Sequence, residues 1–222
     1  MKTFKGIIYK DFVTMGAFSY LFYYLCLLIT AFSAFTGKMS FYLYFLFFFI
    51  FMEQPCGVLW ADDTQGWAKY SQTLMLPRTS IINCKYIHLL LNWFAGIIIV
   101  ELCLIAGNSL RGEPLVDLEN IIVLSVSVLI LCVNSLAGSL MFFGHKFLSV
   151  GFIGMSGGFI GGYYGGSMGE NKSFSMQSFT EVDEDVKFMF ESNFHLKVMI
   201  LCAVITAAVW VFTLVRYKRK DF

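Results

Sequence analysis

Six long apolar runs determine what this chain can fold into. They cover roughly residues 16–36, 41–60, 86–107, 120–142, 147–167 and 196–215. A helix needs about 20 mainly apolar residues to cross the hydrocarbon layer of a membrane. Only 14% of the 222 residues are charged, too few to cover the surface of a soluble domain of this size. The sequence therefore predicts an all-α integral membrane protein, with six transmembrane helices in a single transmembrane domain over residues 1–222.

The distribution of basic residues predicts the orientation. If both termini are cytoplasmic, 11 of the 16 Lys and Arg residues fall on the inner side, as the positive-inside rule requires. The basic run at residues 216–220, directly after the last span, is the strongest anchor. We therefore expect a multi-pass protein of the cell membrane, with residues 168–195 as its largest outer loop.

The first 10 residues are polar and basic and do not resemble a cleaved signal, and we expect residues 1–13 to form one helix. Their apolar side chains lie on one side of a helix, and the lysines lie elsewhere. This pattern predicts a helix in the membrane interface whose lysines meet anionic headgroups. The apolar residues are Phe4, Ile7, Ile8 and Phe12, and the lysines are Lys2, Lys5 and Lys10. The alternative is an extension of the first span.

A polar stretch at residues 60–86 interrupts the apolar pattern between the second and third spans. Asp62 and Asp63 are suited to cap a helix from about Thr64 to Leu74, and Pro77 would end it. Three side chains at spacings of three and four form its apolar-aromatic face: Trp67, Tyr70 and Leu74. Such a segment between two spans indicates a partner on the aqueous side of the membrane.

The fifth apolar run is rich in glycine. Gly154, Gly158 and Gly162 recur every fourth residue, a pattern that lets another helix approach backbone to backbone. We expect close helix packing here, and the alternative is a broken helix that permits motion. The short run from Phe143 to Lys146 predicts a tight hairpin before this span.

Residues able to support catalysis are scarce. No phosphate-binding loop, HExxH or CxxC motif occurs, so we expect no ATPase site and no cofactor in this chain. Two carboxylates fall within apolar runs. Glu53 is suited to an interhelical hydrogen bond or a cavity wall, and Glu101 either does the same or reaches the outer interface.

The polar stretch resembles a segment of the permease subunits of ABC type-2 exporters. Their loop between spans two and three carries a W-x-K-Y-x-x-T-L-P-x-S-R-like sequence, followed by a K-Y pair that opens the third span. The corresponding residues here are Trp67, Lys69, Tyr70, Thr73, Leu74, Pro77, Arg78, Lys85 and Tyr86. The N-terminal KGIIYKDF is similar to the interfacial entry helix of that family, and the length of six spans also fits.

This resemblance implies a cytoplasmic coupling loop at residues 61–85 that binds a separate ABC ATPase subunit, and the ATP and Mg would be held by that partner. The implied contact residues are Asp62, Asp63, Trp67, Tyr70, Leu74, Pro77 and Arg78. It also implies a second permease chain, either an identical copy or a close paralogue. The nearest types resemble exporters of phenol-soluble modulins and peptide antibiotics in Gram-positive bacteria, which implies an amphipathic peptide substrate. No nucleic acid is implied.

Two other functions fit the residues alone. The chain could be a non-transporting scaffold or sensor whose polar stretch docks a cytoplasmic regulator. It could also be an ion-coupled transporter that uses Glu53 and Glu101. An amphipathic segment on the aqueous side favours the exporter or the scaffold over the ion-coupled transporter.

Overall fold

The structure is a computed structural model of the whole chain. It describes residues 2–14, 25, 28, 57–59, 61, 62, 64–67, 70, 77–112, 114, 118–145, 147–151, 154 and 192–219. Within these residues all regular structure is helical. The long helices are α1 (Lys2–Thr14), α5 (Arg78–Arg111), α6 (Leu118–Phe142) and α9 (Ser192–Lys218).

Three described helices are long and apolar enough to cross a membrane. They run over Thr79–Arg111, Val123–Phe142 and Asn193–Lys218, where we expected the third, fourth and sixth spans. The expected spans at 16–36, 41–60 and 147–167 lie mostly outside the described residues. A helix also occupies Lys2–Thr14, although its place in the membrane interface stays a prediction.

Helix α5 is longer than expected at both ends. Pro77 has extended backbone angles and precedes the first residue of the helix, a position that suits a residue without an amide proton. Gly112 ends the helix with a φ of 71°, and its N–H donates to the carbonyls of Asn108 and Ser109. At 1.5 Å per residue the 34 residues span about 51 Å. Lys85 and Tyr86 therefore lie about two turns inside α5 instead of opening it.

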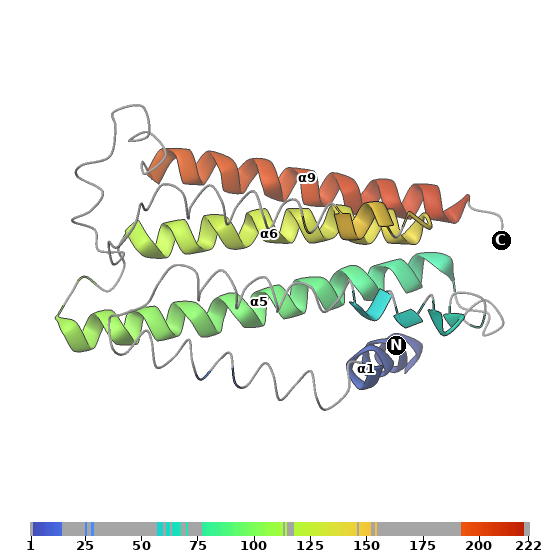
Figure 1. Cartoon of the computed structure of the whole chain (residues 1–222), viewed down its shortest axis with the longest axis horizontal. Coiled ribbons are helices and arrows are strands. Elements are labelled where there is room, and N and C mark those ends of the chain that lie inside the picture. Colours follow the sequence, from blue (N-terminus) through green and yellow to red (C-terminus); the bar gives the residue numbers. More distant parts are fainter. Residues whose placement is uncertain are drawn as a thin grey trace.

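The three long helices lie side by side, and α5 is antiparallel to both α6 and α9 (Figure 1). Helix α6 is the most deeply buried of the three, and its contact with α9 is the most extensive in the bundle. Helix α1 packs on α5 and is drawn nearly end-on beside the start of that helix (Figure 1). The start of α5 and the ends of α6 and α9 therefore share one end of the bundle.

The hairpin after α6 is confirmed. The N–H of Gly144 donates to the carbonyl of Met141, and the N–H of His145 donates to that of Leu140. Gly144 has a φ of 85°, which only glycine adopts at little cost. The chain is helical again from residue 147 to residue 151.

Candidate functional site

The described part of the segment before α5, which we call the 57–70 segment, is helical with an interruption at one glycine. Residues 57–59, 61, 62 and 64 are helical, and Gly66 then adopts a left-handed φ of 71°. Helical geometry returns at Trp67 and Tyr70, where the Tyr70 N–H donates to the Gly66 carbonyl. The expectation of a helix beginning near Thr64 was therefore wrong, because helical geometry is already present at residue 57 and is interrupted at Gly66.

Charged side chains from three separate parts of the chain meet at this end of the bundle. Lys85 Nζ of α5 lies 2.5 Å from Asp11 Oδ1 of α1 and 2.5 Å from Asp62 Oδ2 of the 57–70 segment. Lys10 donates a hydrogen bond to Asp62 and lies 3.2 Å from Asp11. His88 Nδ1, one turn after Lys85 on the same face of α5, lies 3.7 Å from Asp11 Oδ2. We call these five residues the charge cluster.

The charge cluster corrects two expectations. Asp62 does not precede and cap a helix, because residues 61 and 62 are themselves helical and its carboxylate pairs with both lysines. Lys10 pairs with carboxylates of this chain instead of facing lipid headgroups. Asp11 was not predicted as a site residue at all.

Except for Lys10, the charge cluster is almost completely removed from water. The side chain of Asp11 is 0% exposed and that of Lys85 is 5% exposed. Charges buried to this extent are tolerated only when they are paired and hydrogen-bonded. The two lysines and two aspartates balance one another, so moving either the 57–70 segment or α5 away would leave an uncompensated charge, whereas α1 carries one charge of each sign. The charge cluster therefore joins α1, the 57–70 segment and α5 into one unit.

The carboxyl pKa of Asp11 reflects these neighbours. Burial alone would raise this pKa, but His88 and the ammonium of Lys85 outweigh that effect and hold the pKa below its ordinary value of 3.8. The ionised carboxylate is therefore the form that stabilises the folded chain.

Acid is expected to weaken this link only at low pH. Because the pKa of Asp11 is lower in the folded chain, its contribution to stability is complete above the ordinary carboxyl pKa and is lost as pH falls through the folded pKa. The wild type should unfold at a higher temperature than Asp11→Asn. This difference in the midpoint of thermal unfolding should stay constant from about pH 8 to about pH 5 and shrink below about pH 4. Thermal unfolding in detergent measures it. A difference that already disappears near pH 6 would contradict this assignment.

Trp67 and Tyr70 lie next to the charge cluster but differ in exposure. The ammonium of Lys10 lies 4.4 Å from the ring centroid of Trp67, a cation–π contact that attaches this ring to α1. The Tyr70 ring is 5.5 Å from that of Trp67 and is 56% exposed. The pair therefore presents one ring that is held by the chain and one that is open to a partner.

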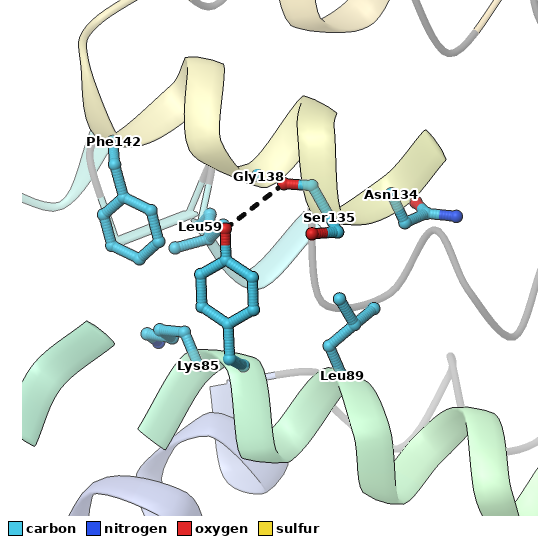
Figure 2. A pocket seen from close by; sticks show the side chains of 8 residues that line it. Leu59, Lys85, Leu89, Asn134, Ser135, Gly138 and Phe142 are labelled. Carbon is cyan, nitrogen blue, oxygen red and sulfur yellow. Dashed lines mark hydrogen bonds between the residues drawn. The ribbon is translucent and has the colours of Figure 1, made fainter. Parts of the chain in front are cut away.

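The start of the 57–70 segment also touches α6. Val58 is buried, and Leu59 Cδ1 lies within ordinary contact distance of Gly138, where an added Cβ would be 3.6 Å away. A small cavity of about 20 Å³ lies between Leu59, α5 and α6. One water molecule needs about 10–15 Å³ on the same measure, so the cavity has room for one water. Figure 2 shows Lys85 of α5 at this cavity, across from Ser135 and Gly138 of α6, with Leu59 beside Gly138.

Aromatic and polar contacts fix the neighbouring ends of the long helices. Tyr86 stacks on Trp210 of α9, with ring centroids 5.5 Å apart, and its hydroxyl lies 3.1 Å from Thr213 Oγ1. The indole N–H of Trp210 donates to Asn83 Oδ1 of α5. Movement of the start of α5 would therefore be transmitted to α9 as well as to α1.

Comparison with known families assigns the chain. The family model described as ABC-2 family transporter protein matches residues 6–218. The chain belongs to the ABC-2 transporter family. No curated protein and no solved structure gives a further match.

Membership identifies this chain as the membrane-spanning permease of an ABC transporter. The permease is not itself the ATPase, and the family implies an ABC ATPase partner in general. Among the described residues, no group of three or more His, Cys, Asp or Glu side chains could hold a metal ion.

The structure places Glu101 of the permease far from the charge cluster. Glu101 lies 16 residues after Lys85 on α5, a distance of about 24 Å along the helix. Its Oε2 accepts a hydrogen bond of 2.7 Å from Asn120 of α6. Glu101 is therefore held by an interhelical hydrogen bond at the opposite part of the bundle.

Several predicted site residues of the permease lie outside the described residues: Asp63, Leu74, Glu53, Gly158 and Gly162. Pro77 is exposed, and Arg78 is the first residue of α5. Gly154 is exposed, and no described residue has an atom within 4 Å of a Cβ built on it. Close packing at the glycines of span five stays a prediction.

Proposed function

We propose that this permease exports amphipathic or hydrophobic peptides, driven by ATP hydrolysis in a separate ATPase subunit. In this proposal the 57–70 segment is the coupling element that contacts the ATPase. The supporting observation is the position of Asp62, which pairs with Lys10 of α1 and Lys85 of α5 at the same time. A push on the 57–70 segment would therefore move α1 and α5 together.

The interface of the proposed ATPase contact is built around Tyr70. An exposed aromatic ring on a rigid support is the kind of side chain that dominates binding energy in protein interfaces. Tyr70 meets this description, because Trp67 beside it is held by Lys10. The ATP and Mg would be bound by the partner, on the cytoplasmic side, and both termini of the permease would lie on that side.

The spans themselves favour an apolar substrate. In α6 no Asp, Glu, His, Lys or Arg occurs between residues 121 and 142, and in α9 none occurs between residues 198 and 215. Selecting a small ion or a sugar requires several convergent polar groups. An amphipathic peptide would instead gain most of its transfer energy from burial of its apolar face. A pathway between two permease chains, identical or closely related, would provide the room.

The test is ATP hydrolysis by the permease reconstituted with its ATPase in proteoliposomes. The panel consists of amphipathic peptides, the same peptides with scrambled sequences, lipids, sugars and inorganic ions. We expect the amphipathic peptides to stimulate ATP hydrolysis and the scrambled peptides to stimulate it little. A scrambled peptide has the same composition as its parent and lacks only the continuous apolar face. Stimulation by an ion or a sugar alone would overturn the peptide assignment but leave the ATP-coupled architecture in place.

A further inference from the structure

We propose that the ends of α6 and α9 form a binding site for the headgroup of an anionic phospholipid. Arg216 and Arg219 would hold the phosphate group. This proposal does not depend on the transported substrate. The site lies at the end of α6 and α9, which is the same end of the bundle as the charge cluster (Figure 1).

The guanidinium group of Arg216 is held in place by two aromatic rings. Its central carbon lies 4.9 Å from the ring centroid of Phe143, in the hairpin after α6, and 5.8 Å from that of Phe212 in α9. The two rings are themselves in edge contact, with centroids 6.2 Å apart. A ring contact leaves the five N–H donors of arginine at the edge of its plane, where they can bind a phosphate group bidentately.

No carboxylate competes for this arginine within the part of the chain that the structure describes. The ion pairs there belong to the charge cluster, and neither Arg216 nor Arg219 takes part in them. Both arginines are exposed. Arg216 lies in the last turn of α9, and Arg219 follows in the turn directly after the helix, where its N–H donates to the Arg216 carbonyl. The two arginines are therefore neighbours at the end of the helix.

An apolar stripe for the acyl chains runs into these two arginines. Val211 and Val215 are 60% and 50% exposed, and Arg219 follows Val215 by four positions. Phe212 is 54% exposed, and Arg216 follows it by four positions. Residues four apart on a helix lie one above the other. A lipid with its chains along Val211 and Val215 would therefore place its headgroup at the arginines.

The experiment measures lipid binding to the purified permease by native mass spectrometry. Phosphatidylglycerol and phosphatidylcholine are titrated against the wild type and against Arg216→Gln, Arg219→Gln and Lys218→Gln. Lys218 is a matched control, because it has the same charge, is exposed and lies two positions from Arg216, on the other side of the helix. We expect each arginine variant to bind phosphatidylglycerol about five-fold more weakly. Lys218→Gln and all phosphatidylcholine titrations should remain close to the wild type.

Two further variants distinguish a specific phosphate site at Arg216 from non-specific attraction of anionic lipid by the positive charge of this region. Arg216→Lys keeps the charge but loses the planar fork, and Phe143→Leu keeps the arginine but removes one ring. Both should weaken phosphatidylglycerol binding. Equal losses for Lys218→Gln and Arg216→Gln, or no loss in Arg216→Lys and Phe143→Leu, would overturn the proposal. Competition by free inorganic phosphate as strong as that by the lipid would also overturn it.

Discussion

Replacing Asp62 with asparagine should strongly destabilise the permease. The variant leaves Lys10 and Lys85 facing one aspartate, and removing one partner of a buried ion pair costs about 3–5 kcal/mol. We expect Asp62→Asn to lower the free energy of unfolding by about 3 kcal/mol, near the lower end of this range. The Lys10 side chain is 23% exposed and can turn toward water in the variant. The free energy of unfolding is measured by titration with denaturing detergent in mixed micelles.

Glu101→Gln is the matched control. It also removes one carboxylate charge from the bundle, but Glu101 accepts a single hydrogen bond from Asn120 and faces no cation among the described residues. We expect this change to cost about 1 kcal/mol or less. Equal losses for Asp62→Asn and Glu101→Gln would show that the charge cluster contributes no more to stability than one interhelical hydrogen bond.

Truncating the exposed aromatic ring of the 57–70 segment should release the ATPase. Tyr70→Ala is expected to weaken the complex by about 2 kcal/mol, roughly 30-fold in Kd, because a buried aromatic anchor commonly dominates an interface. The permease alone should keep its stability, since Tyr70 is more than half exposed. Binding of the ATPase to permease in nanodiscs gives the Kd.

The double variant Trp67→Ala with Tyr70→Ala should abolish co-purification altogether. It should also cost some permease stability, because Trp67 loses its contact with Lys10. Phe94→Ala is a suitable control, since Phe94 is a similarly exposed ring of α5 within a membrane span. If Tyr70→Ala and Phe94→Ala bind the ATPase equally well, the 57–70 segment is not the contact.

The sequence predicted the parts of the fold that local pattern determines. The apolar runs located α5, α6 and α9, and the glycine at residue 144 located the hairpin. The spacing of Trp67 and Tyr70 placed both rings together. Boundaries were less accurate, because the extended backbone of Pro77 starts α5 eight residues before the apolar run does.

The charge cluster could not be predicted from local pattern. Lys85 and Asp11 are separated by 74 positions, and Lys10 and Asp62 by 52, so only the packing of α1 against α5 brings them together. One signal was present, since Asp11 is the only acidic residue in a helix with three lysines. A buried charge requires a partner, so the isolated carboxylate of Asp11 could have indicated an ion pair with a cation elsewhere in the chain, such as Lys85.

We propose that the charge cluster transmits ATP-driven movement from the 57–70 segment to α1 and α5. Asp11→Leu with Lys85→Met tests it, because this double variant removes one charge of each sign, leaves only the Lys10–Asp62 ion pair of the charge cluster, and keeps similar side-chain volumes. Replacing a buried pair by apolar residues is often neutral for stability. The permease should therefore fold and bind its ATPase.

The decisive measurement is the amount of amphipathic peptide exported per ATP hydrolysed, determined in the same proteoliposomes for the wild type and this double variant. Our account predicts that ATP hydrolysis continues while export per ATP falls by at least about five-fold, the usual lower range of coupling between two sites. A double variant that is folded, binds the ATPase and exports as much peptide per ATP as the wild type would contradict it.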